Sequence, residues 1–185
     1  MMDELSLNIL DIAQNSIAAD ATLVEIDVEE DYNNDLLTIR VKDNGKGMSE
    51  EFLKAVENPF VTTRTTRKIG LGISFFKEAA EITGGSISIV SELGVGTSLT
   101  AVFVLSHIDC QPIGNLTQTI ISLVSLNPQI DFIIRYKVGE EEFVFSTPET
   151  KEILGDDAAL NSPPIVIFLT EYVSEHIINL AGGAL

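Results

Sequence analysis

Two polar residues within an otherwise apolar stretch near the start of the chain could take part in proton transfer and metal binding. Asp11 and Asn15 are four residues apart, so in a helix they would share one face. A carboxylate there could accept a proton from an attacking water or hydroxyl, and an amide oxygen is a hard ligand that suits Mg²⁺. Taken alone, the pair would be interpreted as the solvent-facing side of a helix.

The stretch Asp43-Asn44-Gly45-Lys46-Gly47 follows a predicted strand and combines a carboxylate with two glycines. The Asp43 carboxylate could accept a hydrogen bond from the exocyclic amine of adenine. Gly45 and Gly47 would let the backbone approach a ligand closely. The alternative is a tight Asp-Asn-Gly turn without any ligand, which is common in proteins.

Two further glycine-containing stretches could contact phosphates or line a pocket. Gly70-Leu71-Gly72 opens a predicted helix, and the basic residues Arg64, Arg67 and Lys68 precede it. Free N–H groups at a helix N-terminus bind phosphate, and basic side chains can neutralise its charge. Gly94-Val95-Gly96-Thr97 lies between two predicted strands, where it could be a turn or a wall of a nucleotide pocket.

Hydrophobic periodicity predicts the elements that would position these residues. Up to residue 105, we expect a helix over 4–19, strands over 22–29 and 37–41, helices over 50–57 and 72–82, and strands over 87–90 and 99–105. A polar, aperiodic stretch over 58–69 predicts a mobile loop. This order of helix, hairpin, helices and hairpin predicts an α+β fold, with helices on one face of a mixed sheet.

A change in composition after Leu105 predicts a domain boundary near Ser106. We therefore expect one domain over 1–105 and an α/β C-terminal extension over 106–185. Within the extension, the patterns predict a helix over 112–126, a hairpin from 130–138 and 142–146, and a closing helix over 164–180. The extension could recognise a partner protein, or it could pack on the first layer and extend its core.

Charge and composition restrict the possible partners and the compartment. The net charge of −17 argues against a nucleic-acid backbone or an anionic membrane as the main partner. No apolar stretch reaches the roughly 20 residues that a membrane span needs, and the first residues lack the features of a signal peptide. A single cysteine, Cys110, suits a reducing compartment. We expect a cytoplasmic protein with no nucleic-acid and no membrane partner.

The order and spacing of these stretches resemble the GHKL superfamily, which includes DNA gyrase, the ninety-kilodalton heat-shock chaperone, histidine kinases and the MutL mismatch-repair protein. The stretches that resemble its sequence boxes are Leu10–Ala18 (N box), Asp43–Met48 (G1 box), Asn58-Pro59-Phe60 with Thr62-Thr63 (F box of histidine kinases) and Gly70–Ile73 (G2 box). Gly84-Gly85, followed by Ser91-Glu92 and Gly94-Val95-Gly96-Thr97, resembles the end of a histidine-kinase domain. The resemblance covers about residues 5–105. It implies a two-layer α/β sandwich of the histidine-kinase-like ATPase type, with the nucleotide between its layers.

The resemblance also implies the ligands ATP and Mg²⁺ and a role for each matching residue. Asn15 would coordinate Mg²⁺ and Asp43 would read adenine, in a pocket shaped by Gly45 and Gly47. Residues 61–69 would form a lid over the ATP. The other residues expected to bind the nucleotide are Arg67 or Lys68 at the phosphates, Gly70 and Gly72 as hinge and phosphate cradle, and Phe60, Thr62, Leu71 and Thr97.

The chain departs from the family pattern at two points. Most superfamily ATPases carry Glu where this chain has Asp11, whose side chain is one methylene shorter, so water activation would be slower or absent. A sensor histidine kinase has a helix pair with a phosphoacceptor histidine before its N box, but here the N box starts almost at Met1. His107 and His176 lie downstream in contexts unlike the acceptor motif. We therefore do not expect a self-contained histidine kinase.

Three functions are consistent with the sequence. The first, which we favour, is a stand-alone protein kinase of the anti-sigma type, which phosphorylates Ser or Thr on a partner with Asp11 as base. The second is a regulatory module in which ATP closes the lid and alters docking without much turnover. The third is an ATPase whose hydrolysis drives dimer opening, and the lack of a transducer domain argues against it.

Overall fold

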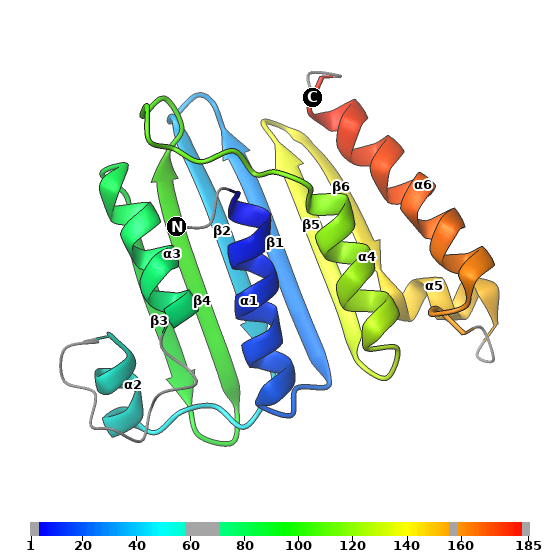
Figure 1. The fold of residues 1–185 in the computed structure, drawn as a ribbon, viewed down its shortest axis with the longest axis horizontal. Helices are drawn as coiled ribbons and strands as arrows, with labels where there is room; N and C mark the ends of the chain where they lie inside the picture. The colour runs from blue at the N-terminus through cyan, green and yellow to red at the C-terminus, as the bar shows by residue number, and fades with distance from the viewer. Residues whose placement is uncertain (1–3, 58–70, 156–158, 183–185) are drawn as a thin grey trace.

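The computed structural model describes residues 4–57, 71–155 and 159–182 of the 185-residue chain. A six-stranded mixed sheet with the order β3-β4-β2-β1-β5-β6 forms its centre (Figure 1). The strands are β1 (Leu23–Asp31), β2 (Leu36–Asp43), β3 (Ser86–Glu92), β4 (Gly96–Val104), β5 (Asp131–Val138) and β6 (Glu141–Ser146). Neighbouring strands run antiparallel except for β1 and β5, which are parallel.

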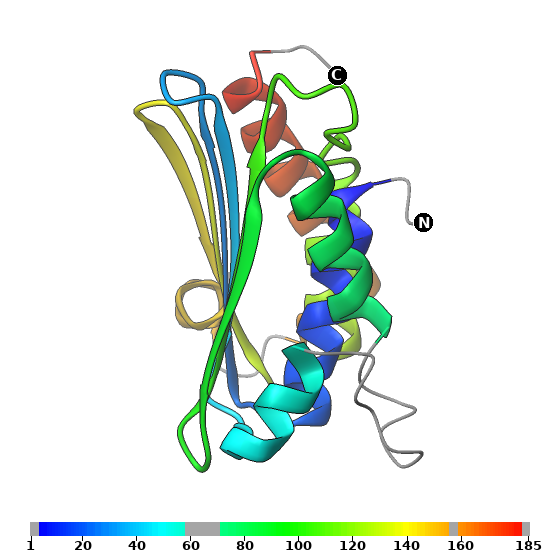
Figure 2. The ribbon, with the colours of Figure 1, turned by 90° about the vertical axis from the view of Figure 1, so that its left-hand side faces the viewer.

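Four long helices cover one face of this sheet (Figure 2). They are α1 (Leu5–Ala18), α3 (Leu71–Ile82), α4 (Leu116–Leu126) and α6 (Pro163–Leu180). The shorter helix α2 (Glu50–Glu57) contacts β3, and α5 (Thr147–Leu154) follows β6 directly and contacts β5. The layered α+β arrangement, with helices on one face of a mixed sheet, is the one that the sequence predicts.

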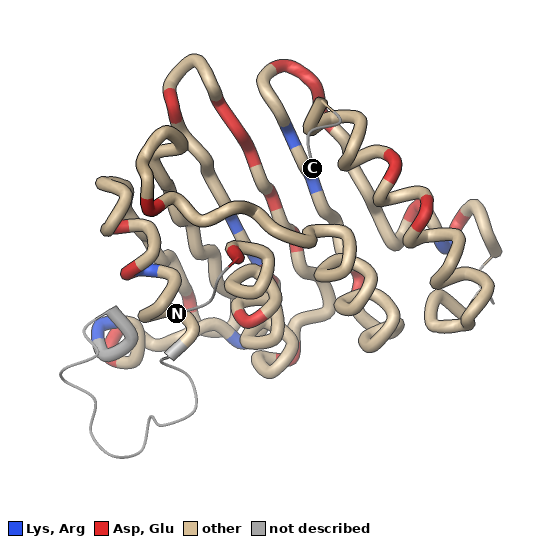
Figure 3. The backbone as a smooth tube through the Cα atoms, turned by 45° about the horizontal axis from the view of Figure 1, so that its top comes forward, with Lys and Arg blue, Asp and Glu red and all other residues tan. Residues whose placement is uncertain are grey.

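Apolar and acidic residues alternate strictly along β1, and this alternation explains why the sheet has one buried and one open face. Val24, Ile26 and Val28 are buried beneath the helices, whereas the carboxylates between them point to the open face. On that face they form ion pairs with basic residues of both neighbouring strands: Glu25 with Lys42 and Arg135, Asp27 with Arg40 and Arg135, and Glu29 with Lys137. Figure 3 marks the acidic and basic positions along the backbone. A slip of one residue would bury these charges, so the pattern fixes the register of the three strands.

The core lies between the sheet and the four helices. Leu5 and Ile9 on α1 are fully buried, and Phe76 on α3 packs against Phe103 on β4 with ring centroids 5.6 Å apart. These contacts hold α1 and α3 side by side over β2 and β4, which is where the candidate site lies.

The part of the chain after Ser106 continues the same sheet. β5 pairs with β1 in parallel, from Leu23 beside Asp131 to Glu30 beside Val138. The division into domains over 1–105 and 106–185 stays a prediction. Among the described residues, none of the helices combines the length and the apolar character that a membrane crossing requires.

Candidate functional site

A cavity of about 440 Å³ lies between α1, α2, α3 and the ends of β2, β3 and β4. Its volume is within the range of small-molecule sites in proteins. Most of its wall is apolar, and the large apolar side chains in it are Ile12, Val41, Met48, Phe52, Ile73, Ile89, Leu93 and Leu99. A small number of polar groups interrupt this wall, as expected for a pocket that orients a largely apolar ligand.

The described wall of the cavity contains one carboxylate, that of Asp43, and one basic residue, Lys46. Asp43 is the last residue of β2 and is 9% exposed. Its Oδ1 accepts hydrogen bonds from the backbone N–H of Gly45 at 2.9 Å and of Thr97 at 3.3 Å, and its Oδ2 accepts one from the hydroxyl of Ser16 at 2.7 Å. A carboxylate oxygen can accept two hydrogen bonds, so Oδ2 retains capacity for a donor on a ligand.

The loop after β2 is held on both sides by backbone and side-chain hydrogen bonds. The side-chain oxygen of Asn44 accepts from the backbone N–H groups of Thr22 and Leu23, both at 2.9 Å, which closes the end of the β1–β2 pair. The N–H of Lys46 donates to the carbonyl of Ala19 at 2.8 Å, and the carbonyl of Lys46 accepts from Gly94. The loop is therefore fixed between the end of α1 and the β3–β4 turn.

Two glycines around this loop are required by backbone geometry. Gly47 has φ +64°, and a Cβ added to it would lie 2.0 Å from the carbonyl oxygen of Glu92. Gly96 has φ +136°, and its added Cβ would lie 2.0 Å from the carbonyl oxygen of Asp43. Both positions combine a positive φ with a backbone contact that no side chain would permit. At Gly47 and Gly96, the close approach is therefore between two backbone segments of the protein.

Asp11 and Asn15 lie one helical turn apart on α1, and only Asn15 lines the cavity. The Asp11 carboxylate instead lies against Gly72 in the first turn of α3, where an added Cβ would be 1.4 Å from Asp11 Oδ2. Along α1, Asp11 and Ser16 are about 7.5 Å apart. The helix therefore carries an acid beside the N-terminus of α3, an amide in the cavity wall and a hydroxyl bonded to Asp43.

A protein-family model described as "Histidine kinase-, DNA gyrase B-, and HSP90-like ATPase" matches residues 1–107, which is more than half of the chain. The chain belongs to this family. Its ATP-binding domain is the matched region, which contains the whole lining of the cavity beside Asp43.

Several relatives of this ATPase-family chain are bacterial sensor proteins and kinases. A putative sensor protein of Shewanella frigidimarina is 30% identical over 109 residues, which cover 58% of this chain and 16% of that protein. Sensor histidine kinase YvrG of Bacillus subtilis is 31% identical, with coverages of 48% and 16%. Sporulation kinase D of B. subtilis is 33% identical, with coverages of 53% and 19%. The chain thus spans less than a fifth of the length of each of these relatives.

Two solved structures share the fold of this chain. The Aquifex aeolicus MutL ATPase domain complexed with ADP has a TM-score of 0.52 and 16% identity, and the match covers 83% of this chain and 70% of that one. The N-terminal domain of a DNA repair protein has a TM-score of 0.53 and 14% identity, with coverages of 78% and 53%. Each match covers a larger share of the chain than residues 1–107 make up, so the shared fold extends beyond residue 107.

The structure brings together many of the residues that the sequence predicts for the ATPase-family site. The predicted residues in the cavity wall are Asn15, Asp43, Gly47 and Thr97. Gly45 lies beside the cavity and donates to Asp43, Asp11 touches Gly72, and Leu71 is the first residue of α3. The remaining predicted residues lie outside the residues that the structure describes: Phe60, Thr62, Arg67, Lys68 and Gly70.

Two serines organise the site, and the sequence predicts no role for either, although both lie in stretches that resemble the family. Ser16 positions Asp43, and Ser91 on β3 accepts from the N–H of Met48 at 2.8 Å while its hydroxyl lies 2.9 Å from that of Thr97. A signal for Ser16 is present in the sequence, because it interrupts the buried stripe that Ile9 and Ile12 begin on α1. For Ser91 the signal is its place in the stretch after Gly84-Gly85 that resembles the family, since serines are otherwise common near strand ends.

Proposed function

We propose that the cavity beside Asp43 binds ATP together with Mg²⁺, and that the protein uses this ATP to phosphorylate a partner protein. The observation that carries the proposal is the Asp43 carboxylate, which is nearly buried and keeps one acceptor position in a cavity whose wall is mostly apolar. The exocyclic amine of adenine is a donor of matching chemistry. Ile89, Leu99 and Met48 supply the apolar surface against which the purine ring would pack.

The other end of the site suits the phosphates. Asn15 lines the cavity on the α1 side and would hold Mg²⁺ through its amide oxygen. Mg²⁺ uses few protein ligands and completes its shell with water and phosphate oxygens, whose charge it would neutralise. The first turn of α3, at Gly72, lies at the positive end of a helix dipole, which favours the negative charge of a phosphate.

The position of Asp11 supports phosphoryl transfer to a hydroxyl. Its carboxylate lies against Gly72 at the N-terminus of α3, so it lies beside the proposed phosphate end of the site. In the proposed reaction, a serine or threonine hydroxyl of the partner forms a bond to the γ-phosphorus. The bond from that phosphorus to the bridging oxygen breaks, ADP leaves with the electron pair, and Asp11 takes the hydroxyl proton. This is the chemistry of an anti-sigma type kinase.

The region after Ser106 offers surface for the partner protein. Ile153 on α5 is 83% exposed, and Ile167 and Phe168 on α6 are 60% and 54% exposed. Exposed apolar side chains that gather on neighbouring elements are typical of protein–protein contact sites. We include this surface in the proposal as the place where the substrate protein docks.

Calorimetry with ATP tests the binding part of the proposal. Asp43→Asn removes the acceptor charge and should weaken ATP binding by about 1–3 kcal/mol, the cost of an unsatisfied buried partner. Asp109→Asn, on the exposed connection after β4, is the matched control and should bind ATP as the wild type does. Removing Mg²⁺ with a chelator should also weaken ATP binding. Equal affinities of the wild type and Asp43→Asn would contradict the site assignment.

Incubation of the protein with γ-labelled ATP and cell extract tests the kinase part. A labelled partner protein that disappears with Asp11→Asn, while this variant still binds ATP, would support the role of Asp11 as base. ATP binding without label transfer would instead indicate an ATP-switched interaction module. Rapid phosphate release without any labelled protein would indicate an ATPase.

A further inference from the structure

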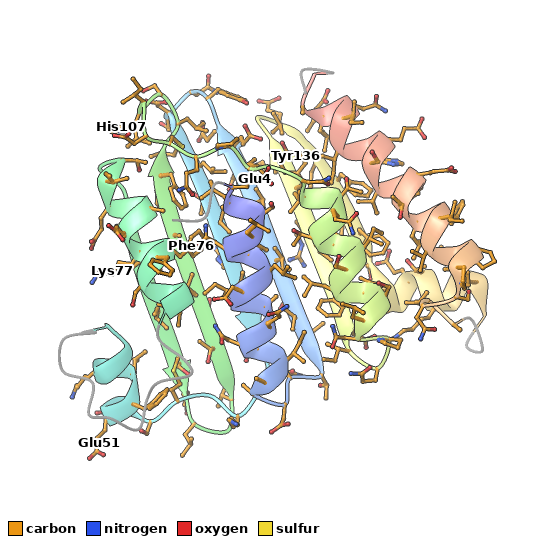
Figure 4. The ribbon with its side chains drawn as sticks, in the orientation of Figure 1. Glu4, Glu51, Phe76, Lys77, His107 and Tyr136 are labelled. Carbon is orange, nitrogen blue, oxygen red and sulfur yellow. The ribbon has the colours of Figure 1, made fainter. Side chains whose placement is uncertain are left out.

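A second cavity, of about 850 Å³, lies between α4, α6, the connection over 105–115 and the ends of β1, β2 and β5. Its lining shares no residue with that of the cavity beside Asp43. Glu4, which precedes α1, lies in its wall, and Figure 4 shows Glu4 and Tyr136 near this connection. Since Glu4 and Asn15 are about 17 Å apart along the helix, the two cavities lie toward opposite ends of α1.

A buried carboxylate without a basic partner lies in the wall of this cavity. Glu30 on β1 is 8% exposed, and its two oxygens accept hydrogen bonds from the hydroxyls of Tyr32, at 2.6 Å, and Tyr136. In the part of the chain that the structure describes, Glu30 forms no ion pair. Buried carboxylates are usually paired with a positive charge, because neutral donors compensate only part of the lost hydration.

The rest of the described wall adds a second carboxylate, hydroxyl and amide groups, and no basic side chain. The Glu4 carboxylate also lines the cavity, and its Oε2 accepts from the N–H of Asn115 and the hydroxyl of Ser6, both at 3.2 Å. Gln111 Oε1 is buried and has no hydrogen-bond partner among the described residues. None of the described residues that line the cavity is Lys, Arg or His. The polar part of the wall therefore offers acceptors that a positively charged donor would complete.

The two tyrosines remain neutral donors at physiological pH. The hydrogen bond to Glu30 raises the pKa of Tyr32 to about 12, and burial together with the bond to Glu30 raises the pKa of Tyr136. Their rings can also contact an ammonium group through cation–π attraction. The other side of the cavity is apolar and includes Leu37 and Ile177.

We propose that this cavity is a second ligand site, which binds an organic amine with its ammonium group at Glu30 and Glu4 and its apolar body against Leu37 and Ile177. Phosphates and carboxylates are disfavoured as ligands, because they would meet two carboxylates in a wall whose described residues include no Lys, Arg or His. This site goes beyond the proposed kinase function, since it neither contains nor contacts the nucleotide-binding residues.

Calorimetry on the full chain, with three small probes of equal carbon number, tests the proposal. The probes are 1,5-diaminopentane, pentylamine and glutarate. At least one of the two amines should bind saturably, whereas glutarate should not. Glu30→Gln should weaken amine binding by at least about tenfold, since it removes the charge that pairs with the ammonium group. Glu29→Gln, on the same strand but on the open face, is the matched control and should stay within about twofold of the wild type.

A second variant keeps the test decisive if Glu30→Gln does not fold. Ser174 on α6 lines the cavity, so Ser174→Phe would fill it without changing either carboxylate. It should weaken amine binding as Glu30→Gln does and leave ATP affinity unchanged. The proposal is wrong if neither amine binds at concentrations up to about 10 mM, or if glutarate binds as tightly as the amines do. It is also wrong if Glu30→Gln or Ser174→Phe folds and keeps the wild-type affinity for the amines.

Discussion

The hydroxyl of Ser16 donates to Oδ2 of Asp43 at 2.7 Å, and both side chains are at least nine-tenths buried. This bond joins the helix that carries Asn15 to the strand that ends in Asp43. It also occupies one of the two acceptor positions of Oδ2, so the direction of the remaining position is fixed by the fold. The geometry of the candidate ATP site thus depends on a side chain with no direct role in the proposed reaction.

Ser16→Ala should weaken ATP binding and lower the free energy of unfolding. The substitution leaves Asp43 Oδ2 without its donor, and the loss of such a hydrogen bond costs about 1 kcal/mol, or about fivefold in affinity. Ser88→Ala, at an exposed position of β3, is the control. Calorimetry with ATP and urea denaturation measure the two effects. Wild-type ATP affinity in Ser16→Ala would show that Asp43 does not need this partner.

Gly72→Ala should disturb the Asp11 carboxylate because its added Cβ would overlap with Asp11 Oδ2. Because the overlap is with the end of a side chain that can rotate, and alanine favours a helix over glycine, we expect a loss of no more than about 1 kcal/mol in stability. The loss should become much smaller in an Asp11→Ala background, where the carboxylate is absent. A double-mutant cycle by urea denaturation gives the coupling. Additive effects of the two substitutions would contradict the contact between Asp11 and Gly72.

Hydrophobic patterning in the sequence was sufficient to predict most secondary-structure elements. The helix predicted over 4–19 is α1, and the strands predicted over 22–29 and 37–41 are β1 and β2. Apolar and polar residues alternate clearly over these two strands because one face of the sheet is open and charged. Helix α5, over Thr147–Leu154, was not predicted, since it is short and only Thr147 in it is buried.

Long-range neighbours could not be predicted from these patterns. The alternation over 130–138 indicates a strand, but nothing in it specifies that β5 pairs in parallel with β1 and extends the sheet. In the structure, Arg135 of β5 forms ion pairs with Glu25 and Asp27 of β1, which favours this pairing. The sequence does not reveal these ion pairs, because their partners are far apart along the chain. For the site, residue types and spacing indicated Asp43 and Asn15, whereas the contact of Asp11 with Gly72 depends on how α1 packs on α3.

Glu25→Gln should make the protein less sensitive to acid. The hydrogen bond from Lys42, with the charges of Lys42 and Arg135, lowers the pKa of Glu25 below 4.5 against the opposing effect of burial. The folded state therefore holds the Glu25 proton less tightly than the unfolded state does. The stabilisation is complete above the unfolded pKa of 4.5 and is lost as the pH falls through the folded pKa.

Urea denaturation at neutral pH and below pH 4.5 measures this effect. At neutral pH, Glu25→Gln should lower the free energy of unfolding by up to about 1 kcal/mol, since the ion pairs are partly exposed. In acid, the difference from the wild type should shrink. Glu141→Gln, at an exposed position of β6, is the control. A difference that stays constant with pH would show that the ion pairs of Glu25 do not contribute.

Tyr32 should titrate about two pH units above an ordinary tyrosine. Its hydroxyl donates to the Glu30 carboxylate, which raises its pKa from 10.0 to about 12 because the phenolate would lose this bond and meet a negative charge. The folded state thus holds this proton more tightly than the unfolded state does. The resulting stabilisation is complete below pH 10 and is lost as the pH rises toward 12.

The difference between the tyrosinate absorbance of the wild type and that of Tyr32→Phe isolates this titration. Circular dichroism shows whether both proteins remain folded. Glu30→Gln should return the midpoint toward 10.0, whereas a midpoint near 10.0 in the folded wild type would show that the bond between Tyr32 and Glu30 is absent in solution.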